Sequence, residues 1–334
     1  MMPAGSEKTV DAFDRGLAPA SASPEIAVLI PCFNESVSIG TVVREFRDAL
    51  PDAAIYVYDN NSSDDTVAQA RKAGAIVRRE RRQGKGFVVR RMFADVEADI
   101  YLMVDGDDTY DAAIAPDLVA LLLEEQLDMV NAARVERAGS GAYRFGHKAG
   151  NRLLTSCVRV LFGTGFRDML SGYRVFSRRF VKSFPVTSSG FEVETELTVH
   201  TLELEMPFAE VPTDFCDRPA GSTSKLNTIS DGVRILWTIC KLAKRERPIL
   251  LFGASAVFLM LVAAILMLPI VATYLETGLV PRFPTLFIAV GLMIISLLSL
   301  TCGLILDTVT CGRREMKRLA YLSIAYGAME RPKI

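Results

Sequence analysis

Short apolar runs and longer helical patterns alternate along residues 25–225. Each apolar run is bounded by turn residues, as buried strands usually are, and apolar positions three or four apart fill the segments between the runs. This order predicts an α/β domain with a parallel, doubly wound sheet, in which ligands bind beyond the carboxyl ends of the strands. The predicted strands are 26–30, 55–58, 75–77, 100–104 and 129–132, and the predicted helices are 38–49, 65–73, 86–97 and 116–127.

Two long runs without charged residues follow, at 249–275 and 285–306. At about 1.5 Å per helical residue they reach roughly 40 and 33 Å, enough to cross a hydrocarbon core of about 30 Å. The segment between the runs is short, whereas Lys and Arg cluster before the first run and after the second. The positive-inside rule therefore predicts a transmembrane hairpin, 248–307, in the cell membrane, with the large domain and both termini in the cytoplasm.

The remaining segments divide the chain further. Residues 1–24 are rich in Ala, Pro and Ser, lack the apolar core of a signal peptide, and predict a flexible arm. Within 226–247 apolar residues recur on one stripe that includes Trp237, which favours an amphipathic juxtamembrane helix on the membrane surface. A helix that packs on the soluble domain is the alternative. A cytoplasmic tail, 308–334, is expected after the hairpin.

Composition agrees with this mixed architecture and narrows the chemistry. Hydrophobic residues make up 50% of the chain, and its mean hydropathy is +0.26. The net charge of −1 leaves no overall positive field to hold nucleic acid. The six cysteines form no C-x-x-C pair, and the two histidines are too few for a multi-histidine metal site. The sequence leaves open whether the chain forms a homo-oligomer.

Acidic residues gather where the predicted strand 100–104 ends, in the sequence VDGDDTY that begins at Val104. Asp105 and Asp107 are one residue apart and can face a common cation. Their hard oxygen ligands suit Mg²⁺ or Mn²⁺, with phosphate oxygens completing the metal's shell. An isolated D-x-D is more often an acidic turn that caps a helix, so this assignment depends on its context.

Five other stretches supply that context. They are VLIPCFNES from Val28, YDNNSSDDT from Tyr58, DMLSGYRVF from Asp168, EVP from Glu210 and RPAGSTSKL from Arg218. With the D-x-D run, their order and spacing resemble the family 2 glycosyltransferases over about residues 26–235. The last three are similar to motifs of the polyprenyl-phosphate sugar transferases, the dolichol-phosphate-mannose synthase group. The resemblance implies a GT-A type, Rossmann-like nucleotide-sugar domain, 25–225.

Carried over by position, the resemblance assigns roles at the strand ends. Asp105 and Asp107 would bind the metal and the diphosphate, and so count as catalytic, while Asp59 would hold the base. Lys85, in the sequence RQGKG, and the nearby backbone amides suit phosphate, with a plain turn as the alternative. The implied nucleotide-sugar set is Pro31, Glu35, Asp59, Lys85, Gly106, Arg218, Ser224 and Lys225.

The acceptor side is also implied by the resemblance. Arginines hold the acceptor phosphate in the lipid-phosphate group, which by position implies Arg134 and Arg144 as further catalytic residues. A planar guanidinium can grip two phosphate oxygens, and solvated surface charge is the alternative. Arg218, with Ser224 and Lys225, would form a lid loop that closes on the diphosphate.

Two features leave alternatives open. DGDDTYD departs from the DADLQH or DADLSH of the mannose synthases, which leaves the donor sugar and the metal shell undetermined and places Thr109 where a family metal contact can occur. Glu192, Glu194 and Glu196 lie on a probable helix, where ordinary surface acids are the simpler interpretation. The family nevertheless often places a functional Glu there.

The sequence thus predicts a membrane-bound, inverting hexosyltransferase that moves a sugar from UDP or GDP to a dolichyl- or undecaprenyl-type phosphate at the cytoplasmic face. A phosphate monoester has a second pKa of about 6, so this acceptor is already an anion and needs no strong general base. A family 2 transferase acting on a sugar hydroxyl of a glycolipid or polysaccharide is an alternative, in which Asp168 or Glu194 would take a proton. A non-catalytic nucleotide-sugar sensor or scaffold is another.

Overall fold

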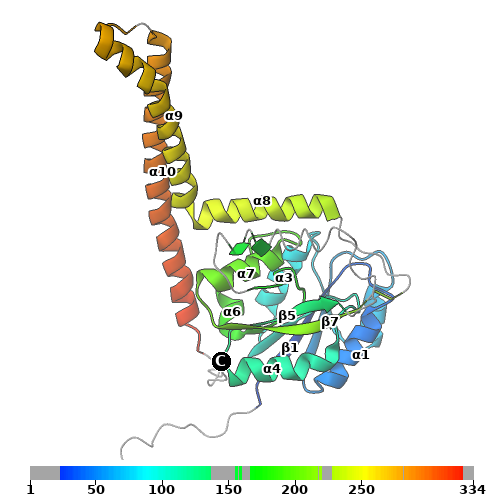
Figure 1. Cartoon of the computed structure of the whole chain (residues 1–334). Helices are drawn as coiled ribbons and strands as arrows, with labels where there is room; N and C mark the ends of the chain where they lie inside the picture. The colour runs from blue at the N-terminus through cyan, green and yellow to red at the C-terminus, as the bar shows by residue number, and fades with distance from the viewer. Residues whose placement is uncertain are drawn as a thin grey trace, which may run out of the picture.

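The computed structural model describes residues 23–136, 155–156, 158–159, 166–216, 218–219, 228–280 and 282–325. One sheet of seven strands organises the domain, in the order β3-β2-β1-β4-β6-β5-β7. The sheet lies between two layers of helices (Figure 1). The strands are β1 (Ile26–Cys32), β2 (Ala54–Asp59), β3 (Ile76–Arg79), β4 (Ile100–Met103), β5 (Met129–Glu136), β6 (Arg174–Ser177) and β7 (Phe208–Phe215). The α/β prediction is confirmed, because all five predicted strands are present.

The sheet departs from the predicted parallel pattern at one strand. β1 to β4 pair in parallel, and so do β5 and β7, but β6 is antiparallel to both of its neighbours. Because β6 runs in reverse, its beginning lies at the edge where β4 and β5 end. The loop that precedes β6 therefore reaches the same edge of the sheet as the strand ends that carry the predicted site.

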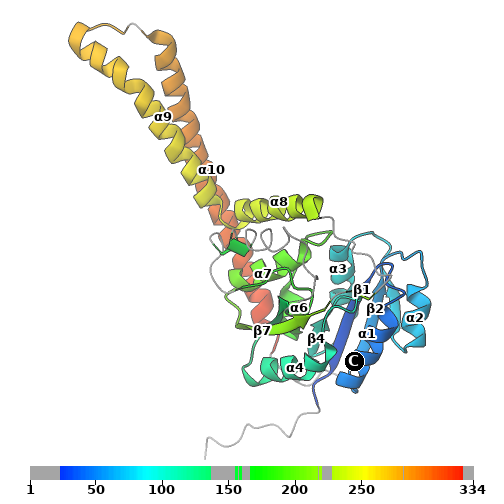
Figure 2. The ribbon, with the colours of Figure 1, turned by 45° about the vertical axis from the view of Figure 1, so that its right-hand side comes forward.

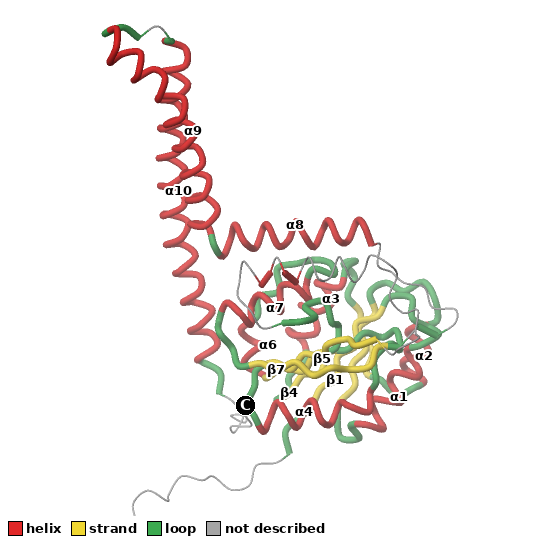
Figure 3. The backbone as a smooth tube through the Cα atoms, in the orientation of Figure 1, coloured by secondary structure: helices red, strands yellow, loops and turns green. Residues whose placement is uncertain are grey.

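Helices cover both faces of the sheet (Figure 3). One apolar core is packed under α1 (Ile39–Ala49), α2 (Thr66–Lys72) and α4 (Ala115–Glu124). A second core lies on the other face, under α3 (Lys85–Asp95), α6 (Arg178–Ser183) and α7 (Val193–Glu203). Alternate side chains of the buried strands point into the two cores, as in a doubly wound sheet.

Three helices follow the domain: α8 (Thr228–Glu246), α9 (Pro248–Thr277) and α10 (Phe283–Leu322). α9 and α10 pair along their length and project away from the sheet, while α8 lies across their base (Figures 1 and 2). Ser296 and Ser299 of α10 donate hydrogen bonds to the carbonyls of Ala256 (2.7 Å) and Phe252 (3.0 Å). Both helices are long and apolar enough to cross a membrane, and they contain the two predicted spans.

α8 has two different faces. Ile235, Ile239 and Leu242 are buried against Met169 and other residues of the domain. Trp237 lies on the opposite side of the helix, with 73% of its surface exposed. α8 therefore packs on the domain, as the alternative interpretation expected, and also presents an apolar face outward.

α10 continues well beyond the predicted span, through residues 308–322, and contacts the domain. Its Lys317 forms an ion pair with Glu203 of α7 (2.6 Å), and Tyr321 donates a hydrogen bond to Asp128 (2.7 Å). This part of the expected cytoplasmic tail is thus a helical extension anchored to the domain.

Candidate active site

The loops after β1 and β2 are joined where these two parallel strands end. Asp59 ends β2, pairs in register with Cys32, and accepts a hydrogen bond from the Ser62 amide (3.0 Å). In the loop after β1, the Glu35 amide donates to Thr66 Oγ1 (2.8 Å). Asp59 and Glu35 are 3% and 7% exposed, so two buried carboxylates mark this edge of the sheet.

The D-x-D turn lies against the same loops. A Cβ at Gly106 would come within 2.6 Å of Cys32 Sγ, so only glycine lets the turn approach β1 this closely. Ser38 Oγ donates to the Gly106 carbonyl (2.7 Å) and fixes the approach. Burial, and then the charges of Glu35 and Asp105, raise the pKa of the Cys32 thiol. The thiol therefore lies in a buried place close to several carboxylates.

Asp107 lies at the centre of this site. It is 6% exposed and accepts a hydrogen bond from Thr109 Oγ1 (2.6 Å). Arg218 forms an ion pair with Asp107 (2.5 Å) and approaches Glu35 (3.6 Å). Burial, and then the charge of Asp105, raise the pKa of Asp107. This carboxylate thus gains from any cation placed beside it.

Lys85 provides the second cation. Its ammonium lies 2.5 Å from Asp105 Oδ1 and 2.5 Å from Glu194 Oε1, and its side chain is 8% exposed. Burial alone would lower the pKa of Lys85, but the two carboxylates raise it above its ordinary value. Lys85 is therefore a buried, permanently charged group beside the D-x-D turn.

The donor set fits a divalent cation shared with a substrate. Among the described residues, no group of three or more His, Cys, Asp or Glu side chains is arranged to hold a metal ion. Asp105 and Asp107 offer two carboxylates, and Mg²⁺ is commonly bound by one or two carboxylates together with substrate phosphates. Each carboxylate already carries a cationic partner, so positive charge is accommodated here.

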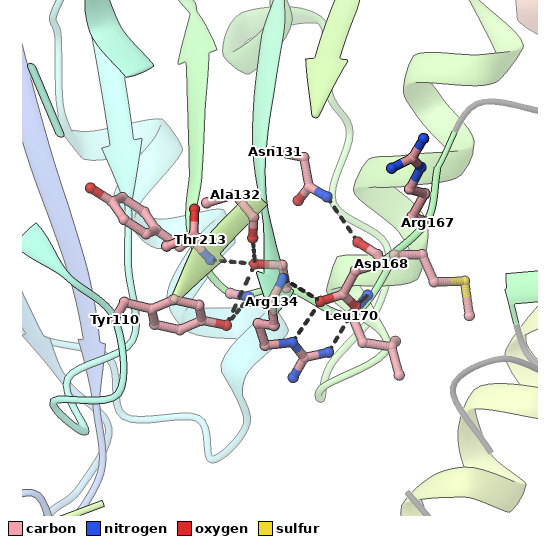
Figure 4. A network of polar contacts seen from close by, with 12 residues as sticks. Tyr110, Asn131, Ala132, Arg134, Arg167, Asp168, Leu170 and Thr213 are labelled. Carbon is pink, nitrogen blue, oxygen red and sulfur yellow. Dashed lines mark hydrogen bonds and ion pairs between the residues drawn. The ribbon is translucent and has the colours of Figure 1, made fainter. Parts of the chain in front are cut away.

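Arg134, the residue predicted to bind the acceptor phosphate, forms an ion pair with Asp168 (Figure 4). Arg134 of β5 binds Asp168 with both arms of its guanidinium, through Nε (2.6 Å) and Nη2 (2.8 Å). The Asn131 side chain donates to the Asp168 carbonyl and to Glu210 Oε1, both at 2.8 Å. The guanidinium is thus fixed in orientation at the edge of the sheet.

The loop before β6 connects this arginine to the acidic turn. Asp168 begins the loop, and Gly172 ends it against Asp105, where a Cβ would come within 2.2 Å of Asp105 Oδ2. The Gly172 amide donates to the Tyr110 hydroxyl (2.9 Å). Arg134 and the D-x-D carboxylates therefore belong to one site.

The structure tells which predicted residues come together. Seven of them meet at the strand ends: Glu35, Asp59, Lys85, Asp105, Gly106, Asp107 and Arg218. Pro31 lies beside them, within β1. Arg144, Ser224 and Lys225 lie outside the described residues.

The surface interpretation of the three acids on α7 is wrong. Glu192, Glu194 and Glu196 are 8%, 4% and 7% exposed. Glu194 is the residue that this interpretation missed in the site. The sequence does indicate that these acids are buried. They alternate with Val193, Thr195 and Leu197, and so they do not form the polar face that a surface helix requires.

Known proteins share this architecture. The family model described as Glycosyl transferase family 2 matches residues 27–184. Glycosyltransferase AglJ of Haloferax volcanii is 35% identical over 230 residues, which cover 69% of this chain and 75% of the relative. The dolichyl-phosphate hexose transferase of the same organism is 28% identical over 223 residues, which cover 67% of this chain and 96% of the relative.

A solved structure agrees with these matches. It is glucosyl-3-phosphoglycerate synthase from Mycobacterium tuberculosis, in complex with Mn²⁺, UDP-glucose and phosphoglyceric acid. The likeness has a TM-score of 0.53 at 25% identity and covers 66% of this chain and 80% of the other. The predicted GT-A type fold and glycosyltransferase activity are confirmed, and the chain belongs to glycosyltransferase family 2.

Proposed function

We propose that the protein transfers a hexosyl group, with inversion, from a UDP- or GDP-sugar to a polyprenyl phosphate at the cytoplasmic face of the membrane. One observation carries the proposal. Met169, which follows the Arg134 partner Asp168, is buried against Ile235 and Ile239 of α8. Arg134 and its partner Asp168 therefore lie close to α8, the helix at the base of the apolar hairpin, where a lipid phosphate would arrive.

The donor half of the proposal rests on the strand-end carboxylates. Asp59 and Glu35 can accept hydrogen bonds from a base or from sugar hydroxyls, and Asp105 with Asp107 would hold Mg²⁺ or Mn²⁺ against the diphosphate. When bound, the metal would screen the charge that builds on the leaving diphosphate. The Mycobacterium tuberculosis neighbour, crystallised with Mn²⁺ and UDP-glucose, supports this assignment.

Cationic side chains of the chain itself supply the remaining charge. Lys85 and Arg218 pair with Asp105 and Asp107, and both would contact the diphosphate oxygens when the donor binds. Arg134, and Arg144 by resemblance, would hold the acceptor phosphate. A phosphate dianion attacks without losing a proton, so the site needs no general base for this acceptor.

The topology of the hairpin supports the membrane half of the proposal. The end of α10 contacts Asp128 and Glu203 of the same domain that precedes α9. Both ends of the hairpin therefore lie on one side of the membrane, and the basic residues at these ends favour the cytoplasmic side. The name of the Haloferax dolichyl-phosphate hexose transferase agrees with a lipid-phosphate acceptor.

The test is a transfer assay with the full chain in bilayer discs. Labelled UDP- and GDP-hexoses are incubated with Mg²⁺ or Mn²⁺ and a polyprenyl phosphate, and the products are identified by mass. A polyprenyl-phosphate hexose from at least one donor is expected. The matched control acceptor is the corresponding polyprenol, which lacks the phosphate. Transfer to the polyprenol, or only to sugar hydroxyls of glycolipids, would contradict the proposed acceptor.

A further inference from the structure

Lys85 has two carboxylate partners, and the proposed chemistry uses only one of them. Asp105 is 29% exposed at its side chain and is expected to bind the metal. Glu194 is 5% exposed at its side chain, lies on α7, and forms its ion pair within the described structure with Lys85. Among the described residues, Glu194 Oε2 has no hydrogen-bond partner. The second carboxylate therefore requires an explanation of its own.

The backbone around Lys85 is held rigidly against the segment that leads into α7. A Cβ at Gly84 or Gly86 would come within 2.1 or 2.3 Å of the carbonyl oxygens of Ser189 and Ser188, so both positions require glycine. Gly84 also has a φ of +134°, which disfavours any other residue. The Gly86 amide donates to the Ser189 carbonyl (3.1 Å). The backbone of Lys85 is thus held in place on both sides.

Glu196 fixes the other side of this contact. Its carboxylate accepts hydrogen bonds from the amides of Thr187 (3.1 Å) and Ser188 (2.9 Å) and from both of their hydroxyls. Because Glu196 and Glu194 belong to the same turn of α7, one helix end holds both the backbone beside Lys85 and its ammonium.

Metal binding would leave Lys85 in need of this second partner. When Asp105 turns to a divalent cation, the ammonium loses one of its two carboxylates. A buried cation without a partner is costly, so without Glu194 the lysine would keep Asp105 and compete with the metal. With Glu194 in place, the ammonium stays charged and fixed while Asp105 is released.

We propose that Glu194 is a positioning residue that holds Lys85 for the diphosphate of the nucleotide-sugar donor and frees Asp105 for the metal. The assignment rests on the donor half of the proposed function and is independent of the acceptor. It gives Glu194 a role through Lys85, with no proton taken from an acceptor.

A double-mutant cycle on the full chain tests this role. Glu194→Gln, Lys85→Met and the double variant are compared with the unchanged protein by calorimetry of UDP and GDP binding in the presence of Mg²⁺. Glu194→Gln is expected to weaken binding about tenfold or more, as for the loss of a charged contact. The double variant should bind as Lys85→Met does, because Glu194 has nothing to position once the lysine is gone.

Glu192→Gln is the matched control, because it removes the same charge from the same end of α7 and Glu192 makes no ion pair among the described residues. It should retain nucleotide affinity. Glu194→Asp keeps the charge with a shorter reach, and should recover part of the affinity lost in Glu194→Gln. Thermal unfolding of each variant checks that the fold is retained.

Steady-state transfer separates this role from proton transfer. At saturating donor, kcat of Glu194→Gln should change less than about threefold while KM for the donor rises. Unchanged nucleotide affinity in Glu194→Gln, or single losses that multiply in the double variant, would overturn the inference and leave the proposed function standing. An unchanged protein that binds neither nucleotide would overturn both. Loss of lipid-phosphate transfer with an intact cycle would overturn the acceptor alone.

Discussion

Asp107 is buried close to a second carboxylate, Asp105, and its own charge is stabilised by Arg218 and Thr109. We expect Asp107→Asn to abolish transfer with Mg²⁺ or Mn²⁺ while the domain stays folded, because the change would remove a proposed metal ligand and keep the side-chain volume. Initial rates and thermal unfolding provide the measurement.

The control for Asp107→Asn is the next carboxylate. Asp108→Asn also removes one negative charge, and asparagine readily adopts the φ of +61° found there. Asp108→Asn should retain most activity. Near-normal turnover of Asp107→Asn with either metal would show that the metal is bound elsewhere.

Arg134 requires a more careful variant, because its partner Asp168 is 7% exposed at the side chain. Removing one member of a buried pair costs about 3–5 kcal/mol, so Arg134→Gln is combined with Asp168→Asn to leave no lone charge. We expect this double variant to lose about tenfold to hundredfold in acceptor affinity, with donor affinity nearly unchanged.

Arg218→Gln is the comparison for the Arg134 variant. Arg218 contacts Asp107 and Glu35, which we propose bind the donor, so its substitution should weaken diphosphate binding instead. Nucleotide calorimetry and the acceptor dependence of initial rates separate the two effects. Loss of nucleotide binding in the Arg134 double variant, with normal dependence on lipid phosphate, would move Arg134 to the donor side.

The sequence is most informative about residues at strand ends. Asp59, Asp105 and Asp107 are predictable because the end of a parallel strand fixes where its next residues lie. For Glu194 the sequence indicates burial but not the pairing with Lys85, which comes from a distant part of the chain. The Arg134–Asp168 pair also escapes prediction, since it requires the reversed strand β6 to bring the Asp168 loop to this edge.

At the scale of elements, α8 offers a direct test of membrane contact. Trp237 is the only tryptophan in the chain, and it lies on the face of α8 away from the domain. In bilayers we expect its fluorescence to be shifted to the blue and quenched by brominated lipids, because tryptophan prefers the headgroup region. Emission typical of water, unaffected by brominated lipids, would show that this face does not touch the bilayer.

The junction of α7, α8 and α10 contains two facing glutamates. Burial, and then Glu203, raise the pKa of Glu246. Burial alone would also raise the pKa of Glu203, but Lys317 holds it below its usual value. Among the described residues, the other charged or titratable groups at the junction are Glu196 and His200 of α7, Arg245 of α8, and Arg313 and Arg314 of α10.

Opposite effects on stability follow from these two shifts. A carboxyl whose pKa is raised by folding contributes stability below its unfolded pKa of about 4.3, and this contribution is lost as the pH rises through the folded pKa. At neutral pH, ionised Glu246 therefore lowers the stability of the folded state. A lowered folded pKa stabilises above the unfolded value and is lost as pH falls. At neutral pH, Glu246→Gln should therefore raise the unfolding temperature and Glu203→Gln should lower it.

Unfolding scans across pH check this pair. The gain in Glu246→Gln should disappear as the pH falls to the unfolded pKa of about 4.3, whereas the loss in Glu203→Gln should disappear only as the pH falls further, through the lowered folded pKa of Glu203. Two shifts of the same sign at neutral pH would contradict the assigned directions.

Helices and strands are predictable from the sequence where one hydrophobic pattern continues without interruption along the whole element. The five predicted strands and the two apolar spans follow from uninterrupted apolar patterns. β7 contains Glu210 and Asp214 and does not show that pattern. The extension of α10 is not predicted, because its charges end the apolar run from which the span is inferred, whereas the helix itself continues to Leu322.

At the scale of the whole molecule, α10 joins the apolar hairpin to the domain. We expect Tyr321→Phe to lower the free energy of unfolding by about 1.5–3 kcal/mol, since it removes a hydrogen bond to the buried, charged Asp128. Tyr274→Phe makes the same change on an exposed position of α9 and should have no effect. Chemical unfolding in detergent compares the two, and equal stabilities would show that this contact contributes little.

The length of α10 also bears on how the protein is made. Lys317 and Tyr321 leave the ribosome only after both apolar segments, yet their partners Glu203 and Asp128 belong to the domain synthesised before them. The catalytic domain therefore receives these contacts only after both helices of the hairpin have been synthesised. A chain in which α10 failed to reach the domain would leave Glu203 without Lys317 and Asp128 without the Tyr321 hydroxyl, although Asp128 would keep its ion pair with Arg179. Correct placement of the hairpin and full stabilisation of the domain are therefore coupled.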